Sequence, residues 1–461
     1  YLFDDTLVAT FGARRDKQTQ RFGASSADLS LSKGSGVAEP DPALNPLAAD
    51  GTSEGNSVSW GLVLHTPRKL RDRLPWGSNI SLTYSDGKNT RVENRYDFNG
   101  VALPNAKGHT KDFGVVLSTL NDRLSLKITK YKTDVTDANL SSVSSETTTL
   151  GNNTYYLRNL EAWGVASAMT DLAGREVDAQ GHSMVSGWEW YWNWALVDNG
   201  FDGTYNDPQS AAFKNSPSTI KQTAAINSWL AQMPAQSWFD AYGFAVNVAK
   251  AKAGDWRNAI AGWTPTAGVG GVQPSGGGRI NGSWPTGTAN NESKGWEFEL
   301  AGEPIKGLNL SLNASKQTAA QTSLGQSLVD TIEAAYAKYQ SPAGDLRLWW
   351  GGDNTVRQYF VSNIWAAYQF QLQTNGKLVA EMSPWRFNAV ANYNFQKGAL
   401  KGVNVGLGYR WSQGVILGYH LNELKDNLDV NSPIWGKSEQ HLDLWAGYDR
   451  KLSRKINWRI Q

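Results

Sequence analysis

The sequence has 461 residues, with 46 glycines, 21 tryptophans and 17 tyrosines but no cysteine. The absence of cysteine excludes a disulfide scaffold and thiolate chemistry. The mean hydropathy is −0.46 and no run of about 20 apolar residues occurs, which excludes a bundle of membrane-spanning helices. The 44 basic and 42 acidic residues are spread along the chain with a net charge of +2, so composition indicates no nucleic-acid surface.

Segments of alternating polar and apolar residues recur along the chain and predict about eleven β-strands. Val403 to Trp411 is an example, in which Val, Leu, Tyr and Trp alternate with Asn, Gly and Arg. Each such segment would have one apolar face and one polar face. In chain order, the segments lie near residues 2–16, 57–67, 78–85, 109–119, 122–134, 293–302, 308–315, 387–395, 403–411, 439–452 and 454–461.

The connections between these segments alternate between long and short. In a meander of antiparallel strands, this alternation places every long connection at one end of the sheet. Outer-membrane barrels have this asymmetry, with short periplasmic turns and long external loops, whereas a soluble sandwich has no reason for it. The long connections are 17–56, 86–108, 135–292, 317–385 and 413–438.

Aromatic residues lie near the ends of the apolar faces, where rings at the level of lipid headgroups are expected. A soluble β core could also hold such rings. We interpret the apolar faces as lipid-facing and the polar faces as the lining of a pore. The rings are Tyr84, Tyr131, Trp296, Tyr409, Trp411, Tyr448 and Trp458.

These patterns predict an all-β fold, a transmembrane antiparallel up-and-down β-barrel with long external loops that contain short helices. Bacterial single-chain barrels have an even number of strands. Because the count here is odd, we expect residues 1–461 to form part of a larger barrel. Residues 135–292 and 317–385 would be its two largest external loops.

Several stretches resemble the barrel of TonB-dependent receptors. The resemblance extends over nearly the whole chain, although each stretch is only a strand with its turn. The stretches are Asp5 to Asp16, Leu103-Pro104, Gly108 to Gly114, Asp122 to Leu126, Ser293 to Leu300, Tyr393 to Phe395, Gly398 to Gly402, Gly408 to Trp411 and Lys455 to Arg459.

The resemblance implies a bacterial outer-membrane receptor that takes up a ligand, such as a siderophore or a glycan, without catalysis and without a cofactor. Its partners would be outer-membrane lipid, the imported ligand and the TonB complex. Coupling to TonB would require a plug domain, which we do not find in this sequence, and the terminal aromatic residue of such barrels is also missing. A plug-free porin is an alternative.

Tryptophans at two-residue spacing are the most unusual local pattern. On one strand face they could stack on sugar rings or aromatic ligands, or they could form the core of the loop insertion. We take these residues, together with a later Trp pair, as candidate ligand contacts: Trp188, Trp190, Trp192, Trp194, Trp349 and Trp350.

Helical spacing predicts a helix near residues 218–232 and a second over Ser327 to Tyr339, while Val356 to Leu372 fits a helix or a strand. The acidic run from Asp198 to Asp207 lacks EF-hand spacing, and the five histidines lack zinc-ligand spacing, so no metal site is predicted.

A secreted glycoside hydrolase or carbohydrate-binding protein is the rival from another class. It would need a pair of carboxylates across a cleft, for which Glu189, Glu297 and Glu299 are candidates. Glu297 and Glu299 fall on the same strand face, however, and would also fit the wall of a pore. No catalytic residue is therefore assigned.

Overall fold

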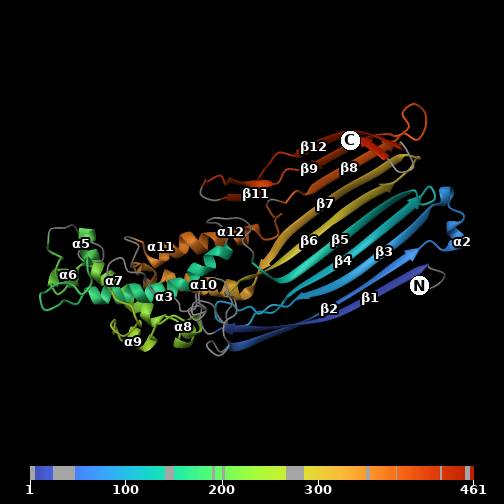
Figure 1. Ribbon diagram of the computed structural model, residues 1–461. Coiled ribbons are helices and arrows are strands. Elements are labelled where there is room, and N and C mark those ends of the chain that lie inside the picture. The colour runs from blue at the N-terminus through green and yellow to red at the C-terminus, as the bar shows by residue number, and fades with distance from the viewer. Residues whose placement is uncertain are drawn as a thin grey trace.

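The structure is a computed structural model. It describes residues 6–23, 47–140, 150–188, 193–199, 203–265, 285–348, 354–380, 382–425, 428–451 and 457–460. These residues form a large antiparallel β-sheet with a group of helices at one end (Figure 1).

The main sheet contains eleven described strands, and each of them pairs with the strand of this sheet that follows it in the sequence. The predicted strand number and meander order are therefore confirmed. The described strands form an open sheet rather than a closed barrel, with β1 and β13 at its edges. The strands are β1 (Leu7–Gly23), β2 (Leu47–His65), β3 (Asn79–Arg91), β4 (Ala106–Thr119), β5 (Leu124–Asn139), β6 (Thr288–Gly302), β7 (Leu308–Leu324), β8 (Trp385–Asn394), β9 (Val403–Ser412), β12 (Glu439–Lys451) and β13 (Asn457–Ile460).

A second, two-stranded sheet lies in the connection between β9 and β12. It consists of β10 (Ile416–Leu421) and β11 (Leu428–Trp435), paired antiparallel. The sequence pattern did not predict this hairpin, because its strands are short and irregular in register.

The register of the main sheet separates the side chains into two faces. Leu62, Tyr84 and Phe113 lie directly opposite one another on β2, β3 and β4. We call the face that carries them the apolar face. Many of its large side chains are exposed, among them Phe11, Trp60, Leu62, Leu64, Ile80, Leu82, Phe113, Trp296, Leu407, Leu442 and Leu444.

The opposite face, which we call the polar face, carries mainly hydroxyl, amide and charged side chains. Ser85 lies opposite Asp112, and Asn388 lies opposite Arg410. Tyr131 also belongs here, since it lies opposite Asp112 on β4 and Gly295 on β6. The prediction that Tyr131 lies on the apolar face was wrong. Side chains alternate between the faces along β5, and Leu126, Ile128 and Lys130 occupy the apolar face, so Tyr131 lies on the opposite one.

Short turns lie at one end of the sheet. The β2–β3 link contains α2 (Arg68–Arg71) and η1 (Pro75–Gly77). The β4–β5 turn holds Leu120, Asn121 and Asp122, all with φ near the left-handed value, at 57°, 57° and 63°. Asn121 N–H also donates to Trp76 O at 3.0 Å, which joins the two turns.

Helices gather at the opposite end of the sheet, as Figure 1 shows, and we call this group the helical cap. The long connections after β5 and β7 supply it. It comprises α3 (Leu150–Gly174), α5 (Trp194–Asn199), α6 (Ala211–Asn215), α7 (Pro217–Ala231), α8 (Gln236–Tyr242), α9 (Val248–Lys252), α10 (Gln326–Gln340), η3 (Pro342–Asp345), α11 (Val356–Phe360), η4 (Val361–Trp365) and α12 (Ala366–Thr374).

Both predicted helices are present as α7 and α10, and the ambiguous segment from residue 356 is helical. Ser216 caps the N-terminus of α7, since its side chain accepts a hydrogen bond from Thr219 N–H. The cap has the principal hydrophobic core among the described residues, built around α3, whose Leu160, Val165 and Met169 are fully buried. No helix in the described ranges combines the length and the apolar character needed to cross a membrane.

Candidate functional site

The link between β3 and β4 joins the cap to the sheet. Buried Arg95 in this link donates through Nη1 to Asp137 O at 2.9 Å and to Asn139 Oδ1 at 2.6 Å, both at the end of β5. Phe98 O in the same link accepts hydrogen bonds from two residues of α8, Tyr242 Oη at 2.8 Å and Trp238 Nε1 at 3.1 Å. The cap is therefore held against the sheet by directed contacts.

A cavity of about 410 Å³ lies beside these contacts, and we call it the cap cavity. Residues from the β3–β4 link, α3, α8 and α10 meet here although they are far apart in the sequence. The lining is Phe98, Asn99, Leu157, Arg158, Glu161, Gln232, Pro234, Trp238, Asp330, Thr331, Ala334, Ala335 and Lys338.

An ion pair between two helices forms one side of the cap cavity. Lys338 Nζ on α10 lies 2.6 Å from Glu161 Oε2 on α3, and both side chains are largely buried. Lys338 Nζ also lies 4.0 Å from the centre of the Trp229 ring, which stacks on Tyr339. The cation is thus fixed by a carboxylate and by an aromatic face.

Tyr339 keeps its proton in this setting. Burial, the Glu161 charge and a hydrogen bond to Glu161 Oε1 at 3.3 Å hold the pKa of Tyr339 well above 10. Its hydroxyl therefore acts as a donor to the carboxylate.

Arg158 places a second cation at the cap cavity. Its guanidinium donates from Nε and Nη2 to Asn159 Oδ1, at 2.8 and 2.7 Å, and lies 5.7 Å from the centre of the Tyr242 ring. The cap cavity therefore offers charges of both signs beside aromatic rings. These groups suit a polar ligand that carries an anionic group and a flat surface.

Below the cap, the polar face of the sheet carries cross-strand ionic and hydrogen-bonded pairs. Ser85 Oγ donates to Asp112 Oδ2 at 2.8 Å, Lys127 pairs with Glu299 at 3.5 Å, and Arg410 pairs with Asp443 at 3.2 Å. Such a surface suits water rather than lipid.

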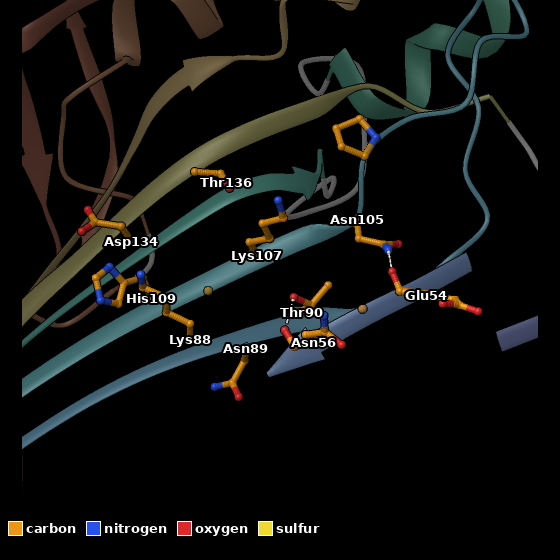
Figure 2. Close-up of a pocket in the computed structure, with 13 residues that line it drawn as sticks. Glu54, Asn56, Lys88, Asn89, Thr90, Asn105, Lys107, His109, Asp134 and Thr136 are labelled. Carbon is orange, nitrogen blue, oxygen red and sulfur yellow. Dashed lines mark hydrogen bonds between the residues drawn. The ribbon is translucent and has the colours of Figure 1, made fainter. Parts of the chain in front are cut away.

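A second cavity, of about 680 Å³, lies at the cap-side ends of β2 to β5 (Figure 2). Hydrogen bonds from side chains to backbone carbonyls frame it: Asn105 Nδ2 donates to Glu54 O at 2.9 Å, and Thr90 Oγ1 donates to Asn56 O at 2.8 Å (Figure 2). Lys88, Lys107, His109 and Asp134 also line it, and the register places all four on the apolar face.

Two of the tryptophans predicted as ligand contacts are described, and both lie in the core of the cap. Trp188 is 1% exposed and Trp194 is 6% exposed. Trp194 begins α5 rather than continuing a strand, and the Arg347 guanidinium lies 4.1 Å from the centre of its ring. The other candidates, Trp190, Trp192, Trp349 and Trp350, lie outside the described residues.

The described residues contain no group of three or more acidic or histidine side chains that could hold a metal ion. In the acidic run, Asp198 accepts hydrogen bonds from Ser218 Oγ at 2.6 Å and from Arg347 at 3.2 Å. Residues 200–202 of the run lie outside the described ranges. Asp198 thus helps to join α5 to its neighbours.

The carboxylates considered for glycoside hydrolysis do not form a described pair across a cleft. Glu297 and Glu299 share the polar face of β6, and Glu299 pairs with Lys127. Glu189 is outside the described residues.

Sequence reasoning did not identify the residues of the cap cavity. Lys338 was placed correctly in a predicted helix, but Glu161 lies on α3, which was not predicted. The signal was available in the Ala-rich, mostly apolar run from residue 159 to 173. Its apolar residues are spread around the helix, so the run lacks the periodicity of a surface helix and is recognised as a buried helix only after the fold is known.

No family model and no curated protein match the sequence. Solved structures found in a structural comparison with this chain include the alcaligin outer-membrane receptor FauA from Bordetella pertussis, with 10% identity and a TM-score of 0.35 over 99% of this chain and 39% of that chain. The ferric-catecholate import receptor Fiu from Escherichia coli has 11% identity and a TM-score of 0.37, over 99% of this chain and 37% of that chain. The FrpB iron transporter from Neisseria meningitidis has 9% identity and a TM-score of 0.36, over 96% of this chain and 36% of that chain.

The chain thus spans between about a third and two fifths of the length of these structures. These solved proteins are two receptors and an iron transporter.

Proposed function

We propose that this chain belongs to an outer-membrane receptor that captures a ligand at its helical cap and passes it along the polar face of the sheet. The two faces of the sheet carry the proposal. One face exposes large apolar side chains, with Phe11 76% and Leu444 74% exposed, and the other carries mainly hydroxyl, amide and charged side chains, such as the Lys127–Glu299 and Arg410–Asp443 pairs. Lipid on one side and water on the other would satisfy both faces.

The cap supports capture rather than free diffusion. Its helices pack into a hydrophobic core at the end of the sheet where the connections after β5 and β7 lie (Figure 1). The cap cavity opens within this structure and has Arg158, Lys338 and Trp238 in its lining. We propose a siderophore or a glycan as ligand, with Trp190, Trp192, Trp349 and Trp350 as further contacts. Trp188 and Trp194 would support these contacts from the core.

Lipid contact of the apolar face can be tested by quenching of tryptophan fluorescence. The full-length protein would be reconstituted in phosphatidylcholine with brominated acyl chains. The fluorescence of Trp60 and Trp296 on the apolar face should be quenched, whereas that of Trp229 in the cap should not be. Replacing each of these tryptophans by phenylalanine, one at a time, would show which of them contributes to the quenched signal. Stability without detergent and no quenching would contradict the proposal and favour the secreted hydrolase.

Uptake distinguishes the receptor from the porin. Cells that express the full-length protein would be given a radiolabelled ferric siderophore or an oligosaccharide, with and without a functional TonB system. We expect saturable uptake that stops when TonB is absent. Uptake that continues and rises linearly with concentration would instead identify a passive channel.

A further inference from the structure

Four neighbouring strands each place a lysine on the apolar face; three of these lysines lie directly opposite one another, and the fourth, Lys316, lies two residues nearer the short turns, opposite Trp296. Lys111, Lys132, Lys294 and Lys316 are each eight residues from the turn-side ends of their strands, which are Thr119, Leu124, Gly302 and Leu308. We call these four residues the lysine belt. They come from four neighbouring strands, β4 to β7.

Three residues of the lysine belt, Lys111, Lys132 and Lys294, lie just beyond aromatic side chains of the same face, and Lys316 lies directly opposite one of these rings, Trp296. Phe113 and Trp296 are six residues from the same turn-side ends, so they are nearer to the short turns by one pleat. Lys130, at the level of these rings, holds its Nζ 5.3 Å from the centre of the Trp296 ring. Rings in this position mark the headgroup level of a membrane, and the long stems of the lysines would carry their charges past it.

Register brings the positive charges of the belt together. Lys132 lies directly opposite Lys111 on one side and directly opposite Lys294 on the other. Like charges in directly opposed positions destabilise a sheet. A row of three therefore needs compensating negative charge.

Carboxylates of the chain compensate only part of this charge. Glu292 lies 2.8 Å from Lys132 Nζ and 2.7 Å from Lys294 Nζ, and Asp134 lies 3.2 Å from Lys132 Nζ. Asp86 is 4.0 Å from Lys111 Nζ but is also shared with His109, at 3.0 Å. Within the described part of the chain, Lys130 and Lys316 have no carboxylate within ion-pair distance.

The positive surface continues away from the short turns. The cavity in Figure 2 opens on the same face, and Lys88 and Lys107 line it. Neither of these lysines has an ion-pair partner among the described residues. The surplus of positive charge therefore covers the cap-side end of β3 to β7.

We propose that the lysine belt binds the phosphate groups of an anionic lipid in the outer leaflet. This inference rests on the proposed function, since it requires lipid against the apolar face. The continuity of the belt with that face identifies the occupant as a lipid, and the surplus charge identifies its headgroup as anionic. Ammonium groups suit phosphate oxygens as point charges, and the cavity beyond the belt has room for a headgroup larger than a single phosphate.

The test compares two lipids that differ only in phosphate. The full-length protein would be placed in phosphatidylcholine vesicles that contain either bisphosphorylated lipid A or its dephosphorylated form, and co-purifying lipid would be counted by native mass spectrometry. We expect a preference for the phosphorylated form. The combined variant Lys111→Gln, Lys132→Gln, Lys294→Gln and Lys316→Gln should reduce that preference by about tenfold or more, since each lysine near an anionic surface contributes about a fivefold effect.

Two further variants separate charge from folding. The matched control replaces four cap lysines, Lys214, Lys221, Lys250 and Lys252, by glutamine and should keep the preference. Replacement of the lysine belt by arginine should also keep it, because the charge remains. An excess of inorganic phosphate should not displace the lipid.

The inference would be overturned if the glutamine variant of the belt kept the full preference for phosphorylated lipid A. It would also be overturned if inorganic phosphate displaced this lipid. The fluorescence experiment on Trp60 and Trp296 separates this failure from a failure of the proposed function. Quenching with an unchanged lipid preference would remove only the lipid site. The absence of quenching would remove both.

Discussion

Trp445 on β12 lies across Gly406 on the neighbouring strand β9, directly opposite it in the register. A Cβ atom at residue 406 would come within 1.9 Å of the indole ring. The indole N–H reaches over this glycine to Asn392 Oδ1 on β8, at 3.2 Å. The absence of a side chain at residue 406 therefore lets one tryptophan bridge three strands on the polar face.

Gly406→Ala should displace Trp445 and lower the free energy of unfolding by about 1–3 kcal/mol, as overpacking commonly does. Chemical unfolding in detergent, followed by tryptophan fluorescence, measures the change. Gly108→Ala is the matched control on β4, because a Cβ at residue 108 meets no atom within 4 Å. Equal stability of the two variants would contradict the role assigned to Gly406.

The Glu161–Lys338 pair predicts strong coupling within the cap. Lys338→Met should lower the free energy of unfolding of the cap by about 3 kcal/mol, because it leaves a largely buried carboxylate without its partner. The double variant Lys338→Met with Glu161→Met should recover most of that loss. Near-ultraviolet circular dichroism follows the unfolding, since Trp229 and Tyr339 lie beside the pair.

Lys221→Met serves as the control for this cycle, because Lys221 is 65% exposed in its pair with Asp345. Its effect should stay below about 1 kcal/mol. Additive losses in the double variant of Glu161 and Lys338 would show that the two residues do not act as a pair.

Acid should weaken the cap partly through Glu176. Hydrogen bonds from Arg257 at 2.6 Å and Trp256 at 3.0 Å lower the pKa of Glu176 below its ordinary value of 4.5. A carboxyl with a lowered pKa in the folded state stabilises the fold above its unfolded pKa, and this contribution disappears as the pH falls through the folded value. Glu176→Gln should therefore make the stability less dependent on pH below about 4.5.

Thermal unfolding between neutral pH and about pH 3 measures this dependence. The effect should be small, because Glu176 is 45% exposed in its pair with Arg257. Glu303→Gln, at the turn-side end of β6, is a control outside the cap. A pH profile of the Glu176→Gln variant that follows the unmodified protein would show that the carboxylate has no such role.

The six tryptophans proposed from the sequence should divide into two groups. Trp188→Ala and Trp194→Ala remove buried rings and should each destabilise the cap by about 3–5 kcal/mol. Trp190→Ala and Trp192→Ala should instead weaken ligand binding without a change in the unfolding midpoint. Titration of the ligand and thermal unfolding of the same four variants decide this, and a loss of stability in all four would assign the whole run to the core.

The sheet was more predictable from the sequence than the cap. Alternation over segments such as 403–411 fixes both the strand and the side of each residue, because the period of two relates the sequence directly to the two faces. Short turns such as Leu120 to Asp122 then determine the order of strands. The prediction for one aromatic residue, Tyr131, gave the wrong face, since an aromatic side chain does not by itself show which face of a strand it occupies.

The cap cavity could not be predicted, because its residues meet only through tertiary packing. Glu161 and Lys338 are 177 positions apart and come from different connections. No local period relates such residues to each other. The Trp188 run illustrates the same limit: its spacing fits a strand face, but the packing of the cap places Trp194 at the start of a helix.

Neighbouring residues on β3 give the most direct test of the two faces. Leu82 lies on the apolar face and is 40% exposed, whereas Thr83 lies on the polar face. Leu82→Arg should destabilise the folded protein in a bilayer by about 2–4 kcal/mol, because it places a charge against lipid. Thr83→Arg should be tolerated, since its charge would meet water. Folding in phosphatidylcholine vesicles, followed by tryptophan fluorescence across a urea series, compares the two variants. If Thr83→Arg proved as costly as Leu82→Arg, both faces would be buried in protein, and the sheet would not separate lipid from a pore.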